Sequence, residues 1–263
     1  MRVHLFQIDI AWEDRAATRE RVGRLFDRTA MEPGDLVVLP EMFDSGFSFN
    51  LPRTCDDDGA TRAFIVERAK SKRITIQAGI TARGRDGKAY NRAIVAGPDG
   101  SILAEYDKVH LFPLGREKEP QKLSPGRSAQ VFRWSTAGGA LNVAPIICYD
   151  LRFPELFGQA LGKGAEAFAI GANWPASRAE HWRALNIARA IENQAFVMAV
   201  NRVGKDPNLA YSGGSLLVDP HGRVIAEAGD EESVLSEDLD PREVERWRGE
   251  FPAWKERTAG LAG

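Results

Sequence analysis

The chain is poor in cysteine and histidine, with two cysteines and four histidines among 263 residues. Cys55 and Cys148 form no Cys-x-x-Cys pair, so neither a disulfide framework nor a cysteine-based zinc site is favoured. The histidines also lack the paired spacing of metal ligands: they stand at His4, His110, His181 and His221. We therefore expect no metal site and a reducing, cytoplasmic environment.

Long apolar runs and a strong charge of one sign are lacking as well. No stretch reaches the roughly 20 apolar residues that a membrane-spanning helix needs, and the first residues lack the apolar core of a secretory signal. Lys and Arg total 35 against 37 Asp and Glu, for a formal net charge of −2. A balance so close to zero gives no general attraction to nucleic acid or anionic membrane, so we expect neither as a partner.

The chain has an ordinary globular composition, with 43% hydrophobic and 27% charged residues. Along it, apolar runs typical of strands alternate with segments of helical periodicity. This alternation predicts an α/β fold, a layered sheet with helices outside it. Without a linker or repeat, we expect one domain over residues 1–263. Strands are predicted near 3–8, 36–39, 75–81, 90–96, 101–108, 130–134, 141–147, 165–170, 195–203, 214–218, 224–228 and 233–239, and helices over 14–30, 61–70, 154–161, 178–193 and 241–251.

The sequence is organised around Cys148. The apolar, partly β-branched run before it predicts a buried strand, and Pro154 with Glu155 predicts the start of a helix. A cysteine at such a turn presents its sulfur at the end of a rigid strand, beside backbone N–H groups that can hold a developing oxyanion. The alternative is a structural cysteine in the core, and by itself Cys148 favours that interpretation.

Two other apolar strands end in a charged residue. Glu41 follows the strand at 36–39, where burial raises a carboxyl pKa and makes a usable base. Lys108 ends the strand at 101–108, where an ammonium favours a nearby thiolate and pairs with an oxyanion. The ordinary alternative for each is a solvated charge. Sites in layered α/β proteins form at strand ends, so convergence of all three supplies a base, a cation and a nucleophile for acyl transfer.

Histidine provides an alternative base. His110 lies two residues after Lys108, and His181 lies in the predicted helix over 178–193. A Cys/His pair with either histidine is a working arrangement for nucleophilic catalysis. In that case the histidine, and not the lysine, is the essential partner of Cys148.

Three segments together resemble the signatures of the nitrilase superfamily of carbon-nitrogen hydrolases, and the similarity extends over the whole chain: Leu39-Pro40-Glu41, Tyr106–Phe112 and Cys148–Leu156. The resemblance implies a four-layer αββα sandwich and a catalytic triad of Glu41, Lys108 and Cys148. In the reaction that we expect of this triad, the Tyr149 backbone N–H joins Lys108 at the oxyanion, and no cofactor is needed because side chains handle both the nucleophile and the leaving group. The resemblance also implies a second glutamate before a Ser-Pro-Gly turn, for which Glu119 fits best and Glu117 is the alternative. Members commonly form dimers, so we expect a homodimer with the tail at about 241–263 at its interface.

The C-terminal half resembles bacterial ω-amidases, through Asn173-Trp174-Pro175, His181-Trp182, Ala188–Gln194, Asn201–Gly204 and Phe251–Trp254. This resemblance implies hydrolysis of the terminal amide of a small α-keto acid amide, such as α-ketoglutaramate, to a carboxylate and ammonia. The segment after Cys148 is shared with amidases of deaminated glutathione. Those amidases, an N-carbamoyl amidase, a nitrilase and a non-catalytic binding protein remain alternatives.

Arg152 is expected to hold the carboxylate of such a substrate, because it is a forked donor close to Cys148. Its equally weighted alternative is a salt bridge to Asp150 or Glu155. Three further residues are expected to form the wall of the substrate site, from their position after a catalytic strand or inside a matching motif: Phe43, Asn173 and Trp174.

Overall fold

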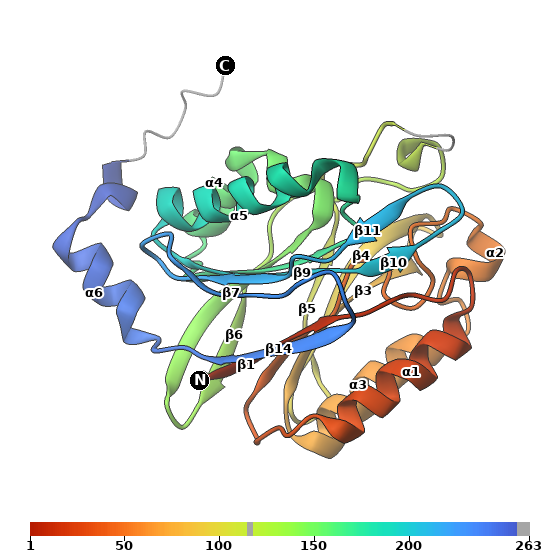
Figure 1. Cartoon of the computed structure of the whole chain (residues 1–263), viewed down its shortest axis with the longest axis horizontal. Coiled ribbons are helices and arrows are strands. Elements are labelled where there is room, and N and C mark those ends of the chain that lie inside the picture. Colours follow the sequence, from red (N-terminus) through yellow and green to blue (C-terminus); the bar gives the residue numbers. More distant parts are fainter. Residues whose placement is uncertain (115–117, 257–263) are drawn as a thin grey trace.

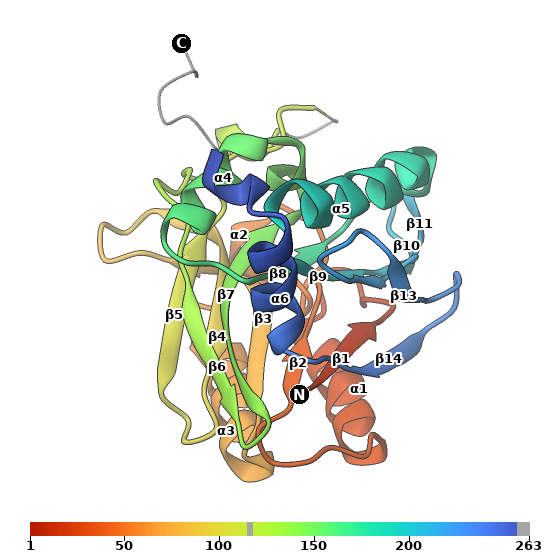
Figure 2. The same ribbon diagram turned by 90° about the vertical axis from the view of Figure 1, so that its left-hand side faces the viewer.

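The computed structural model describes residues 1–114 and 118–256. In that part of the chain, two six-stranded sheets pack face to face and helices cover their outer faces (Figure 1). In Figure 2, α4 (Pro154–Gly162) and α5 (Ala179–Asn193) lie on one side of the sheets, and α1 (Arg15–Arg28) and α3 (Ala60–Lys72) on the other. The predicted α/β class and four-layer αββα sandwich are confirmed.

The first sheet has the order β14-β1-β2-β3-β4-β5. Its strands are β1 (Arg2–Gln7), β2 (Leu36–Val38), β3 (Thr75–Arg83), β4 (Ala89–Ala96), β5 (Ile102–Asp107) and β14 (Ser233–Asp238). β1, β2 and β3 are parallel, whereas β4 and β5 continue as an antiparallel meander. The Asp14 side chain accepts from the Ala17 N–H and caps α1, as its position before the helical pattern predicts.

The second sheet has the order β13-β12-β9-β8-β7-β6. Its strands are β6 (Phe132–Thr136), β7 (Gly139–Ile147), β8 (Ala167–Ala172), β9 (Phe196–Asn201), β12 (Leu216–Val218) and β13 (Val224–Glu227). The central β7, β8 and β9 are parallel and nearly all apolar, because both of their faces are covered. Leu5, Val38, Val143 and Met198 belong to the core between the two sheets.

Some short elements were not predicted. The expected strand at 195–203 is divided into β9 and β10 (Val203–Lys205), and β10 pairs with β11 (Ala210–Ser212) in a separate hairpin. The helix α2 (Leu51–Thr54) lies in a segment without a helical pattern. Elements of three or four residues are too short to show periodicity, so only the chain's path reveals them. The final helix is α6 (Arg242–Glu250), close to the predicted 241–251.

Among the described residues, none of the helices has the length and apolar character needed to cross a bilayer. The carboxyl ends of β2, β7 and β8 lie at the same end of the molecule. Glu41 follows β2 and is hydrogen-bonded to Asn173, which follows β8, and β7 runs parallel to β8. This end of the sandwich holds the predicted site.

Candidate active site

Three charged side chains form a buried cluster at the ends of the strands. The Lys108 ammonium donates to Glu41 Oε1 at 2.8 Å and to Glu119 Oε2 at 2.9 Å, and all three side chains are fully buried. The thiol of Cys148 lies within the electrostatic reach of all three groups. The structure thus brings the four residues together, and their catalytic roles stay predictions. Glu117, the alternative second glutamate, lies outside the described residues.

Two glycines allow the backbone at Glu41 to pass between the sheets. A Cβ atom at Gly79 on β3 would lie 2.7 Å from the Glu41 Cα, and one at Gly171 on β8 would lie 2.8 Å from the Leu39 carbonyl oxygen. Both distances are too short for a side chain. The next residue, Met42, has a φ of 41°, in the left-handed region that non-glycine residues seldom adopt. Close packing of the backbone against β3 and β8 therefore fixes the position of Glu41 from both sides.

Asn91 on β4 is a site residue that sequence reasoning missed. Its Nδ2 donates to Glu41 Oε1 at 2.7 Å and to Glu119 Oε1 at 2.8 Å, so one amide joins the two carboxylates. The second carboxylate is also held by the Phe112 N–H at 2.6 Å. A polar residue in an otherwise buried strand was the available signal, but its partners lie 50 and 28 residues away in the chain.

Burial sets the protonation states of the cluster. Burial raises the pKa of the Cys148 thiol well above its ordinary value, and Glu41 adds to this shift more than Lys108 opposes it. Burial alone would lower the pKa of Lys108, but the carboxylates of Glu119 and Glu41 raise it above its usual range. Burial also raises the pKa of Glu119 against the opposing effect of Lys108. These shifts favour an ammonium at Lys108 and a neutral thiol at Cys148, which then needs a base to react.

Cys148 stands at a strained turn. It ends the path of β7, has a φ of 43° and opens a 3₁₀ turn over Cys148–Arg152, after which α4 begins at Pro154 as predicted. A left-handed conformation at a non-glycine residue costs energy and is concentrated at functional sites. The N–H groups of the first turn, including that of Tyr149, have no carbonyl within the helix to bind. The turn can therefore direct donors toward an oxygen bound beside the sulfur.

Asp150 ties this turn to the segment after Lys108. Its buried carboxylate accepts from the Tyr106 hydroxyl at 2.6 Å and from the His110 N–H at 2.8 Å, and it lies 2.9 Å from His110 Nδ1. The His110 ring also stacks on Phe153, with the ring centroids 3.7 Å apart. The other candidate base, His181, lies with Nδ1 3.2 Å from an Arg152 guanidinium nitrogen. Both histidines therefore have partners other than Cys148, which disfavours the Cys/His interpretation.

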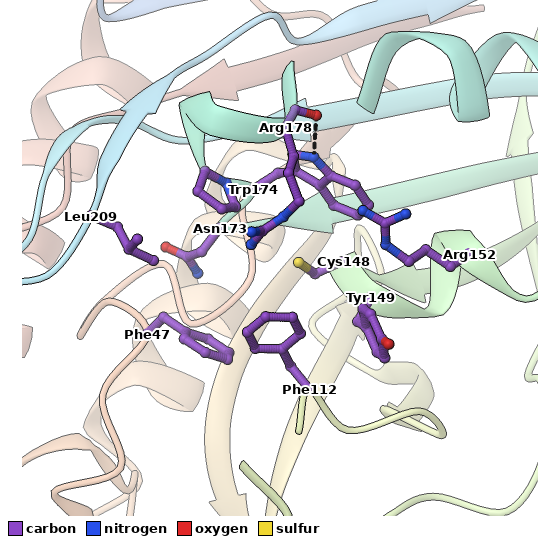
Figure 3. A pocket seen from close by; sticks show the side chains of 10 residues that line it. Phe47, Phe112, Cys148, Tyr149, Arg152, Asn173, Trp174, Arg178 and Leu209 are labelled. Carbon is purple, nitrogen blue, oxygen red and sulfur yellow. Dashed lines mark hydrogen bonds between the residues drawn. The ribbon is translucent and has the colours of Figure 1, made fainter. Parts of the chain in front are cut away.

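A small, mostly apolar cavity opens at the sulfur (Figure 3). It is lined by Phe47, Phe112, Cys148, Tyr149, Arg152, Asn173, Trp174, Pro175, Arg178 and Leu209. A larger outer hollow of about 920 Å³ shares three of these residues, Phe47, Phe112 and Leu209. The three shared side chains thus lie between the two spaces.

The predicted substrate residues have mixed outcomes. Arg152, Asn173 and Trp174 line the cavity, and the Arg152 guanidinium lies 4.8 Å from the centre of a Trp174 ring. Among the described residues, Arg152 makes no ion pair with Asp150 or Glu155, so the salt bridge that was its alternative interpretation is not formed.

Phe43 requires a correction, because it does not line the cavity. It is fully buried in the apolar cluster between the first sheet and helices α1 and α3. The left-handed turn at Met42 redirects the chain after Glu41, and Phe47 supplies the aromatic wall instead. The alternation of side chains expected along an extended strand does not predict that turn.

Comparisons with known proteins agree with this geometry. The family model described as carbon-nitrogen hydrolase matches residues 2–249. The 2-oxoglutaramate amidase of Bacillus subtilis (strain 168) is 35% identical, over 96% of this chain and 95% of its own length. Omega-amidase YafV of Escherichia coli (strain K12) is 33% identical, over 97% of this chain and 96% of its own. The crystal structure of XC1258 from Xanthomonas campestris, described as a CN-hydrolase superfamily protein with an arsenic adduct in the active site, superposes with a TM-score of 0.90 at 34% identity, covering 100% of this chain and 99% of that one.

Proposed function

The chain belongs to the carbon-nitrogen hydrolase family, and from this premise we propose that it hydrolyses the terminal amide of a small α-keto acid amide such as α-ketoglutaramate. It is a hydrolase of the amidase type, similar to ω-amidases and 2-oxoglutaramate amidases. The observation that carries the proposal is the buried contact of Lys108 with Glu41 and Glu119, next to a cysteine at the base of a cavity that also holds arginine side chains.

In the first half of the proposed reaction, the Cys148 sulfur attacks the amide carbon while Glu41 accepts the thiol proton. This step needs a base, because burial raises the pKa of the Cys148 thiol and so disfavours the free thiolate. The carbon–nitrogen bond then breaks as Glu41 returns the proton to the leaving nitrogen. Ammonia departs and the acyl group remains on the sulfur as a thioester.

The developing oxyanion needs donors that are in place before the reaction. The Lys108 ammonium is fixed between two carboxylates, and the Tyr149 N–H lies in the turn that follows the sulfur. We assign both groups to the oxyanion. Removing one such donor typically costs about 100- to 1,000-fold in rate.

In the second half, a water molecule replaces ammonia and attacks the thioester. Glu41 accepts a proton from this water and delivers it to the sulfur, which restores the thiol and releases the carboxylic acid, and this acid then loses its proton to the solvent. Side chains carry every proton, so the proposed reaction uses no cofactor. Glu119 and Asn91 act as positioning residues, because their hydrogen bonds hold Lys108 and Glu41 in place.

The proposal is tested by ammonia release from α-ketoglutaramate, compared with ammonia release from an N-carbamoyl amino acid and an aliphatic nitrile and with release of the peptide amine from deaminated glutathione. Fastest turnover of the keto acid amide is expected. A preference for the ureide, deaminated glutathione or the nitrile would place the chain with an alternative substrate on the same fold. No hydrolysis of any of the four compounds would favour a binding protein.

Asn91→Asp tests the positioning role. A third carboxylate beside Glu41 and Glu119 is expected to lower kcat about 10- to 100-fold, because the amide donor is lost and like charges repel. Activity should partly recover as the pH falls, since the introduced carboxyl group, once protonated, again donates a hydrogen bond. The measurement is kcat against pH. Asn142→Asp is the matched control, because that side chain bonds to Arg133 and Gly164 away from the site, and equal effects of both variants would contradict the role.

We also propose a homodimer, as the family resemblance implies. Two large apolar side chains remain exposed near the C-terminal helix: Phe251 at 55% and Ile191 at 53%. Burial of such groups against a second copy would remove them from water. Light scattering after size-exclusion chromatography is expected to give about twice the mass of the chain, and a monomer would exclude the dimer.

A further inference from the structure

Arg178 is a cavity residue that the proposed mechanism does not use. It ends the short 3₁₀ helix over Ala176–Arg178, which leads into α5. Its N–H donates to the Pro175 carbonyl at 3.0 Å, and its carbonyl accepts from Trp174 Nε1 at 2.8 Å. The backbone of this residue is therefore held on both sides against the cavity wall, and Figure 3 shows the side chain directed into the cavity from there.

The guanidinium of Arg178 points toward the opposite wall of the cavity, and its central carbon lies 5.6 Å from the centre of the Phe112 ring (Figure 3). Within residues 1–114 and 118–256 it has no acidic partner and no hydrogen-bond acceptor. Lys108, by contrast, has two carboxylates at less than 3 Å. A partly buried guanidinium on an aromatic face keeps its forked donors available for a planar anion.

The charged side chains among the described residues around the cavity also favour an anion, because positive charge is in excess. The described lining includes two cations, Arg152 and Arg178, and no acidic side chain. Arg152 is already placed against His181 and the Trp174 ring. Because the remaining lining is largely apolar, a bound anion is weakly screened and attracted to the free guanidinium.

From these observations we infer that Arg178 determines specificity, by binding the carboxylate of an amide substrate at the end opposite the scissile bond. The inference deepens the proposed function and rests on it. It narrows the substrate class to short monoamides of dicarboxylic acids, with or without a keto group. Arg178 thus selects for a negative charge on the substrate, whereas Cys148, Glu41 and Lys108 carry out the reaction.

Succinamate and butyramide test this role, because the two amides have the same number of carbons and differ in a terminal carboxylate against a methyl group. Arg178→Met keeps a long side chain on Phe112 but removes the charge. We expect kcat/KM for succinamate to fall about 10- to 100-fold through a higher KM, with little change for butyramide. Arg178→Lys should recover part of the loss, since it restores the charge without the fork.

The control is Arg183→Met, which removes one positive charge from the following helix, α5, at a surface ion pair with Glu227. It should leave the succinamate to butyramide ratio unchanged. A similar ratio in the unchanged chain and in Arg178→Met would overturn the inference. Equal losses on both amides would indicate a structural role and overturn it as well.

Glutarate binding, followed by calorimetry, separates failure of the inference from failure of the proposed function. If the chain turns over no monoamide of a dicarboxylic acid, the proposed function is wrong, and glutarate still tests Arg178. The expected result is a Kd about 10- to 100-fold weaker in Arg178→Met than in the unchanged chain. Equal affinities, or no glutarate binding to the unchanged chain, would overturn the inference.

Discussion

Cys148→Ala is expected to lower ammonia release from α-ketoglutaramate by about 10⁴- to 10⁶-fold, because no other group can form the thioester. The sulfur, the nucleophile of the proposed reaction, lies at the cavity next to a carboxylate that can accept its proton. A methyl group there leaves the Lys108 cluster in place, so substrate still binds. The measurement is the initial rate of ammonia release at saturating substrate.

Cys55→Ala is the matched control for this variant. Cys55 is also buried, and burial raises the pKa of its thiol to about 12, with the Asp57 carboxylate adding to the shift. Its sulfur lies 3.2 Å from Asp57 Oδ1 and is not part of the cavity lining. The Cys55 variant should retain the rate of the unchanged chain. Equal rates for Cys148→Ala and the unchanged chain would end the thioester proposal.

Glu41→Gln is expected to reduce kcat about 100- to 10,000-fold with little change in KM, since the amide cannot accept the thiol proton. Its oxygen can still accept from the Asn173 N–H, which now lies 3.0 Å from the carboxylate, so the shape of the site is kept. The same change also removes one of the two carboxylates that hold Lys108. Steady-state kinetics on α-ketoglutaramate measure the effect on both parameters.

Mass spectrometry after treatment with a haloacetamide checks that Cys148 in the Glu41→Gln variant is still accessible. Labelling at Cys148 without turnover would separate the loss of the base from a loss of folding. Glu67→Gln, on the exposed face of α3, is the control and should keep normal turnover. A normal kcat in Glu41→Gln would show that another group accepts the proton.

Much of the fold was predictable from local patterns. Apolar runs identify β2 and β7 because strands covered on both faces contain almost no polar residue. The start of α4 at Pro154 and the cap of α1 at Asp14 depend on neighbours within a few residues. The position of Glu41 at the end of such a run likewise marked the edge where the site is built.

Other features depend on contacts between distant segments. Asn91 joins two carboxylates, and the glycines at 79 and 171 leave room for the backbone at Glu41, but each role exists only when the sheets are stacked. The contact of His110 with Asp150, which disfavours His110 as the base, also exists only in the folded chain. No periodicity in a single strand encodes these pairings.

The sequence by itself determined the layered α/β class and the residue types at three strand ends, because both follow from burial and from short-range turn chemistry. Only the tertiary structure decided which side chains reach the cavity. Phe43 turns into the core after the left-handed Met42, while Phe47 and Arg178 meet around the sulfur from separate segments. The direction of a side chain after a strained turn is set by packing across the sheets, which a one-dimensional pattern does not contain.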